Sequence, residues 1–194
     1  MDNDKDPEYK VSVTIDNLAL APIVTSVMKD QKPFMEGRVK KVSMTIAGNG
    51  FEKKQLERYL RGTMSFDVDS CRFIPGKDGS WATVMDVLAV LGIRQSNLIF
   101  NRGKGKLSLK KSKLKIKSLE LAADDLRMRA GGNLTLRRGW DADIDVGFAF
   151  AGDLAETTAK LFKLKRPDRA GFSKGPALRI DGNLRDRAGI ADDH

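Results

Sequence analysis

The sequence predicts an α+β fold: a curved, groove-like antiparallel β-sheet meander accompanied by several short amphipathic helices. Three observations support this prediction. Apolar residues occupy every second position in short runs between residues 107 and 150, as in strands with one apolar and one solvated face. Polar or glycine-containing breaks separate the runs, and the parity of the apolar positions changes across the first two breaks, as it must when a chain reverses direction. Apolar residues at helical spacing flank the meander on both sides.

The chain is expected to begin with a strand and a helix. Apolar and polar residues alternate at residues 9–15, which predicts the strand. Asp16 or Asn17 would then cap a helix that continues to residue 28. A loop follows, and Gly37 opens the second predicted strand.

The next segment continues this alternation of strands and helices. The spacing between Val39 and Val42 breaks the period of two and indicates a β-bulge. A short helix is expected at residues 51–60, followed by a third strand at residues 63–74. Residues 81–91 show the clearest helical spacing in the chain, so this helix is the best candidate for a cover on the sheet.

The meander itself is expected to turn at residues 110–113, 122–125 and 137–139. After it, an amphipathic helix is predicted at residues 153–164 and a last strand at residues 177–184. The alternating apolar residues of the meander are Leu107 and Leu109, Leu114 and Ile116, Leu119 and Leu121, Leu126 and Met128, Leu134 and Leu136, and finally Ala142, Ile144, Val146, Phe148 and Phe150.

Length and composition favour one domain. The 194 residues suffice for a single core, and we place that domain at residues 9–186, with a disordered or vector-derived stretch at residues 1–8 and a frayed tail at residues 187–194. The longest apolar stretch, around residues 84–93, is too short to span a bilayer. Residues 1–6 are polar and acidic and show no signal-peptide pattern.

The net charge of +9 comes largely from lysines between residues 102 and 117. Such a stripe would attract nucleic acid or anionic lipid headgroups, or it would form a solvated sheet face that resists edge pairing. No aromatic residue lies in this segment, so stacking on single-stranded bases is disfavoured. Nucleic-acid binding through phosphates alone stays an open alternative.

The usual groups of an active site are scarce. His194, the last residue, is the only histidine, and Cys71 is the only cysteine, so Ser-His-Asp and Cys-His arrangements and the common zinc spacings are excluded. Residues 103–106 resemble the end of a phosphate-binding loop, but Phe100 stands where that motif requires glycine. We therefore expect no enzymatic activity, no metal and no cofactor.

Three aspartates of the meander resemble the start of a calcium-binding loop. An EF-hand that began at Asp141 would also use Asp143 and Asp145. Its sixth and twelfth positions require glycine and glutamate, whereas this chain has Val146 and Gly152 there. The aspartates are therefore interpreted as the solvated side of a strand.

The order of the elements resembles the C-terminal region of AsmA-like proteins, from about Tyr9 to Asp186. The closing stretch GPALRIDGNLRD is similar to the last strand of that family, although Asp186 stands where proline is frequent. One phrase of the family pattern matches Leu60, Gly62, Phe66, Val68 and Phe73. A second phrase matches Phe100, Gly105, Leu107, Leu109, Leu114, Ile116, Leu119, Leu121, Asp125, Met128, Gly132 and Leu136.

This resemblance implies a protein of the Gram-negative envelope. Its bulk would lie in the periplasm, and an N-terminal helix outside this sequence would anchor it to the inner membrane. Members are similar to TamB and the bridge-like lipid-transfer proteins, whose curved sheet holds acyl chains and serves phospholipid transport and outer-membrane homeostasis. The implied partners are phospholipids or other acyl lipids, together with envelope proteins.

On this hypothesis one face of the meander binds lipid. The alternative is that helices at residues 81–91 and 153–164 close the same face as an ordinary core, which would leave a scaffold domain; a basic nucleic-acid-binding module is the third possibility. The residues expected to face lipid are Leu126, Met128, Leu134, Leu136, Ile144, Val146, Phe148 and Phe150. The residues expected near headgroups or an anionic surface are Lys104, Lys106, Lys110, Lys113, Lys115 and Lys117.

Overall fold

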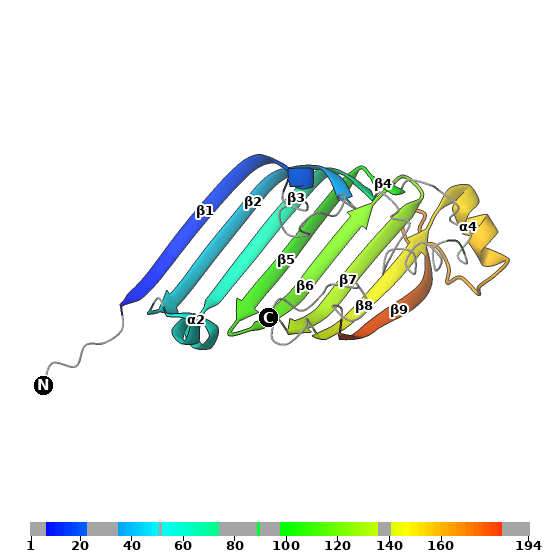
Figure 1. Ribbon diagram of the computed structural model, residues 1–194. Coiled ribbons are helices and arrows are strands. Elements are labelled where there is room, and N and C mark those ends of the chain that lie inside the picture. Colours follow the sequence, from blue (N-terminus) through cyan, green and yellow to red (C-terminus); the bar gives the residue numbers. More distant parts are fainter. Residues whose placement is uncertain are drawn as a thin grey trace, which may run out of the picture.

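Nine strands form one open antiparallel sheet in the computed structural model, which describes residues 7–22, 35–50, 52–73, 89, 98–135 and 141–183 (Figure 1). The strands are ordered β1-β2-β3-β5-β6-β7-β8-β9, and β4 pairs with the end of β3. Their bounds are β1 (Glu8–Ala19), β2 (Met35–Asn49), β3 (Arg61–Phe73), β4 (Leu98–Phe100), β5 (Arg102–Lys110), β6 (Lys113–Ala122), β7 (Leu126–Thr135), β8 (Asp141–Phe150) and β9 (Ser173–Asn183).

The described residues include two helices longer than one turn, α2 (Lys53–Tyr59) and α4 (Gly152–Ala159). They lie near opposite ends of the strands: α2 joins β2 to β3, and α4 follows β8 beside β9 (Figure 1). The predicted antiparallel meander is confirmed, and the described chain is mostly β-sheet with few helices. Of the helix expected at residues 81–91, only residue 89 is described, and it is helical; the turn at residues 137–139 lies outside the described residues.

Two predicted helices differ from the structure. Residues 16–19 were expected to start a helix, but they belong to β1, and the helical residues described after them are 20–22. Asn17 has a φ of 58°, a left-handed conformation that asparagine tolerates better than most residues, and Leu18 beyond it pairs with Val39. Pairing with β2 therefore overrides the helix-capping tendency of the sequence. Farther along the chain, α4 ends at Ala159 instead of residue 164.

Two bulges keep the apolar residues on one face. The bulge expected between Val39 and Val42 is confirmed, because the β2–β3 register shifts on both sides of Val39 and buries its side chain. A second irregularity places Leu107 opposite Ile116 while Lys106 lies opposite Ser118, so Lys117 is the extra residue of β6. Without these two bulges the outer parts of β2 and β6 would turn their apolar residues to solvent.

The hydrophobic core lies at the end of the sheet that carries β4 and α4 (Figure 1). Leu154 and Ala155 of α4, together with Phe162 and Leu164 after it, pack against this core from the apolar side. Phe148 and Phe150 lie with ring centroids 6.4 Å apart and rings nearly parallel at 11°. The buried members of the cluster are Val39, Val68, Cys71, Phe100, Leu121, Leu126, Val146, Phe148 and Phe150.

Gly132 of β7 fits the sheet only because it lacks a side chain. Its φ of 148° lies in a region that other residues rarely adopt, and an added Cβ would overlap the carbonyl oxygen of Asp143 and lie 2.7 Å from the Cα of Ile144. Both obstacles are backbone atoms of β8, so no side chain can move aside. Gly147 of β8 differs, because an added Cβ there would have nothing within 4 Å.

We predict that Gly132→Ala lowers the free energy of unfolding by about 2 kcal/mol or more, since the new methyl group must displace β8 and strain the backbone. Gly147→Ala is the matched control and should leave stability unchanged or raise it by up to about 1 kcal/mol. Urea denaturation followed by circular dichroism measures both values. Equal stability of the two variants would contradict the register of β7 against β8.

Candidate functional site: an apolar strip and a charged face

Pairing between the strands aligns apolar residues in rows that cross the whole sheet. Two rows lie farthest from α4, and we call them together the distal apolar strip. The first row is Val13, Met44, Met64, Leu107, Ile116, Gly132, Ile144 and Ile180. The second row is Val11, Ile46, Gly62, Leu109, Leu114, Leu134, Ala142 and Gly182.

Much of this strip remains accessible. Val11 is 52% exposed and Val13 is 37% exposed, although both are large apolar residues. Met64, Leu107 and Ile116 are half-buried and do not belong to the core cluster. An apolar surface that crosses eight strands and is only partly covered is the kind of feature that binds an apolar ligand or partner.

The residues predicted to face lipid share the face of this strip, but the structure divides them. Leu134 and Ile144 lie in the two rows of the strip, but Leu134 is only 9% exposed and Ile144 packs against the core. Met128 is half-buried beside the core, and Leu136 lies outside the described residues. The other four are core residues that are at most 8% exposed, namely Leu126, Val146, Phe148 and Phe150.

The division has a physical cause. Alternation along a strand shows which face is apolar, but it does not show which part of that face another element covers. Helix α4 follows β8 directly, so it packs near the end of that strand, where Phe148 and Phe150 lie. The alternation at residues 142–150 is the clearest in the sequence, but its last residues lie in the part of the apolar face that α4 and the core cover.

Sequence reasoning missed the residues of the strip on the first three strands. Val13, Met44 and Met64 occupy one row, although 31 residues separate the first two in the chain. Their alternation was visible, but only the order of the strands shows that they continue the face of the meander.

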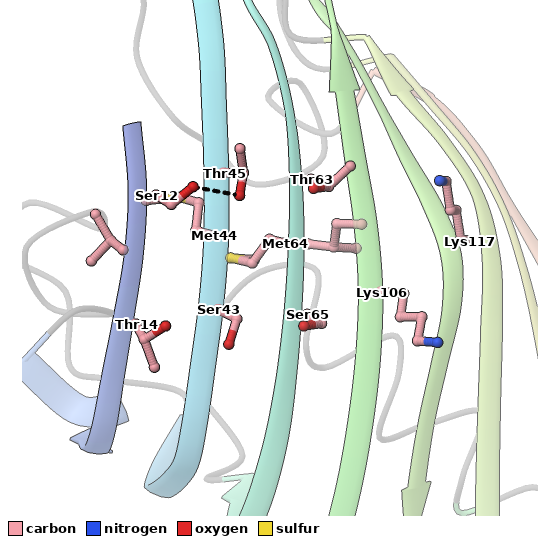
Figure 2. Close-up of a pocket in the computed structure, with 12 residues that line it drawn as sticks. Ser12, Thr14, Ser43, Met44, Thr45, Thr63, Met64, Ser65, Lys106 and Lys117 are labelled. Atoms are coloured by element: carbon pink, nitrogen blue, oxygen red, sulfur yellow. Dashed lines mark hydrogen bonds between the residues drawn. The ribbon is translucent and has the colours of Figure 1, made fainter. Parts of the chain in front are cut away.

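A hollow of about 280 Å³ lies over β1, β2, β3, β5 and β6, and its lining combines residues of the polar face with Val13, Met44, Met64 and Leu107 (Figure 2). Hydroxyl groups from three strands line it, and the hydroxyl oxygens of Ser12 and Thr45 are 3.0 Å apart in a hydrogen bond. Lys106 and Lys117 contribute to the same lining. The hydroxyl residues are Ser12, Thr14, Ser43, Thr45, Thr63 and Ser65.

The six lysines predicted to contact headgroups lie on β5 and β6, which form one hairpin. Lys104, Lys106, Lys110, Lys113 and Lys115 alternate with the apolar residues of these strands, so they belong to the polar face. Lys110 lies directly opposite Lys113, which concentrates positive charge at the turn. The structure therefore places the predicted acyl contacts and the predicted headgroup contacts on opposite faces of the sheet.

A row of alternating charge crosses six strands on the polar face. Each member lies opposite the next member of the row, which carries the opposite charge, and the last two form an ion pair of 3.4 Å. Such cross-strand pairs stabilise a sheet by a few tenths of a kcal/mol to about 1 kcal/mol each. The row is Asp16, Lys41, Asp67, Lys104, Glu120 and Arg129.

Arg127 connects the polar face to the loop before β9. Its guanidinium group lies 3.2 Å from a carboxylate oxygen of Asp168 and 3.8 Å from the ring centroid of Phe172. The backbone N–H groups of Phe172 and Ala170 donate hydrogen bonds to the Asp168 carboxylate, and these bonds together with the nearby Arg127 hold the pKa of Asp168 below its usual value. The loop is thus attached to the sheet by charge and by an aromatic contact.

In the part of the chain that the structure describes, no three His, Cys, Asp or Glu side chains come together in a way that could hold a metal ion. The helices in the same residues are too short or too polar to cross a membrane. The single cysteine, Cys71, is buried in the core, and burial raises the pKa of its thiol to about 11.

Lys104→Glu should destabilise the protein, because the new carboxylate would lie between Asp67 and Glu120. We expect a loss of about 1 kcal/mol in low salt, where two attractive pairs become repulsive, and a smaller loss in high salt. Lys106→Glu is the control, since its neighbours across the strands are Ser65 and Ser118. Urea denaturation at two salt concentrations would contradict the charge row if both variants lost the same stability.

Comparisons with known proteins found no match: no family model, no curated protein and no solved structure matches the chain.

Proposed function

We propose that this protein binds the acyl chains of lipids on the distal apolar strip and carries out no catalysis. The observation that supports the proposal is the strip itself, in which apolar residues of β1, β2, β3, β5 and β6 continue beyond the core, while Ile144 and Ile180 pack against it. The resemblance to AsmA-like proteins suggests the setting: phospholipid transport or outer-membrane homeostasis in the periplasm, with an inner-membrane anchor outside this sequence.

The dimensions of the strip suit an acyl chain. Neighbouring strands lie about 4.8 Å apart, so eight strands span about 34 Å. Each methylene group removed from water contributes about 0.8 kcal/mol, so ten methylenes supply about 8 kcal/mol before the cost of ordering the chain. Met44 and Met64 lie opposite each other in the strip, and their flexible thioether side chains would adapt to chains of different shape.

Curvature would turn this strip into a groove. A β-bulge bends its strand and increases the local twist, and bulges occur at Val39 in β2 and at Lys117 in β6. We propose that the sheet curves around the apolar face, so that a bound chain contacts several strands at once. Contact with several strands would raise affinity without requiring any single strong interaction.

The lysines would act separately from the acyl site. They lie on the face opposite the strip, so one lipid would not reach both through the sheet. We propose that they attract the protein to an anionic membrane surface, where each basic residue close to the surface contributes about 1 kcal/mol. This attraction would weaken with salt, whereas acyl binding would not.

Leu107→Gln should weaken binding of a fluorescent fatty acid by about tenfold, because a polar amide would replace apolar contact area in the middle of the strip. Ser108→Gln is the control, since Ser108 is the next residue of β5 and lies on the opposite face. Titration of both variants and the original protein measures the effect, with thermal melting to show that each is folded. Equal affinities for the two folded variants would exclude the strip as the binding site.

Nucleic-acid binding is the second candidate. The close pair of Lys110 and Lys113, with Lys115 in the adjacent position across from Ser108, favours contact with phosphates. The absence of aromatic residues between residues 102 and 117 would limit such binding to the backbone of the nucleic acid.

Salt dependence distinguishes this second candidate. Binding to a short duplex should weaken with a slope of about 0.9 in log K against log salt for each phosphate neutralised. If the lysine hairpin binds the phosphates, the double variant Lys110→Gln with Lys113→Gln should lower this slope by about 2. Fluorescence anisotropy at several salt concentrations measures it, and the absence of any binding in low salt would exclude this function.

A further inference from the structure

Strand β1 forms one edge of the sheet, and its outer side is suited to hydrogen-bond with a further strand. Among the described residues it hydrogen-bonds to β2 on one side only, and ten of its twelve residues are exposed. Edge strands are usually protected by proline, bulges or a covering element. Residues 8–16 of β1 contain no proline and pair with β2 in one continuous register.

Strand β9, at the other edge of the sheet, carries features that hinder pairing with a further strand. Strand β9 contains Pro176, which has no N–H group to donate, and Gly182 adopts a φ of 94° near its end. The register of β8 against β9 also shifts between Gly147 and Ala149. The two edges therefore differ, and β1 is the one that can accept another strand.

We propose that β1 pairs with β1 of a second copy of this chain, antiparallel, about a twofold axis at Val13. In this register Val13 lies opposite Val13 of the other copy, and Val11 lies opposite Ile15. Paired residues of antiparallel strands lie on the same face, so the apolar faces of the two sheets become continuous.

The charges of β1 select this register. With Val13 at the axis, Lys10 of each copy lies opposite Asp16 of the other, and Ser12 lies opposite Thr14. Moving the axis by half a residue spacing would place Val13 opposite Ser12. An apolar residue would then pair with a residue that belongs to the polar face. Moving the axis by one residue, to Ser12, would place Glu8 opposite Asp16, so like charges would meet; moving it to Thr14 would place Lys10 opposite Leu18 and Asp16 opposite Ser12, so both attractions would be lost.

The same pairing extends the alternating charge row on the polar face and the distal apolar strip on the other face. Lys10 of the second copy would continue the alternating charge row beyond Asp16, its present end. Val11 and Val13, the most exposed members of the distal apolar strip, would gain neighbours from the second copy. The inference rests on the edge and its charges, and it does not depend on the binding of acyl chains.

Charge-reversed variants of the full chain test the proposal. The original protein should elute with twice its mass of 21.4 kDa in size-exclusion chromatography with light scattering. Lys10→Asp and Asp16→Lys should each elute as monomers, because each places like charges opposite one another twice. An equimolar mixture should again form dimers, since a mixed pair restores both attractions. Lys106→Asp, on the same face but away from the edge, should remain dimeric.

Disulfide formation tests the register itself. Val13→Cys should link two copies under mild oxidation, because directly opposed residues have Cα atoms about 4.5–5.5 Å apart, within reach of a disulfide. Val11→Cys should not link to itself, since its opposite residue is four positions away, about 13 Å along the strand. Cys71 is buried with a raised pKa of about 11, so it should not interfere.

A monomeric original protein, or dimers that persist in Lys10→Asp, would overturn the proposal. Equal crosslinking of the two cysteine variants would also overturn it. None of these measurements uses lipid, so their failure would leave the acyl-binding proposal to be judged by its own titration.

Discussion

The structure depends on one constraint: the register of each strand pair must place apolar residues opposite apolar residues. Only then do the apolar side chains of all the strands lie on the same face of the sheet. Eight strands meet this condition, and the bulges at Val39 and Lys117 restore it where the alternation in the sequence breaks. A shift of one residue in any strand would turn its apolar side chains to solvent. The separation of an apolar face from a charged face follows from this agreement.

A sheet with one apolar face needs a cover, and here the core forms at one end. Phe100, Phe148 and Phe150 pack there with α4, whereas the row through Met64 and Leu107 stays half-buried. On the polar face, the row of alternating charge lies at the same end of the sheet as the core, and the hydroxyl residues lie beside Lys106 and Lys117. Acyl binding on one face and attraction to an anionic surface on the other are the uses that we propose for this arrangement.

The sequence was sufficient to predict the antiparallel meander, the helix at α2 and the bulge near Val39, because each depends on local spacing. It was not sufficient for the end of β1, where pairing of Leu18 with Val39 overrides a capping pattern. It also could not separate Phe148, which is buried in the core, from Ile144, which shares its face but is only half-buried at the margin of the core. The charge row escaped notice because its members become neighbours only through strand order.

We propose that the half-buried apolar residues beyond the core contact acyl chains. The most direct measurement places a photo-crosslinking residue at Met64, with Ser65 as the opposite-face control and Phe148 as the core control, and identifies lipid adducts by mass spectrometry after irradiation in cells. We expect phospholipid adducts at Met64 and none at Ser65 or Phe148. Adducts at none of the three positions, or equally at Met64 and Ser65, would contradict this proposal.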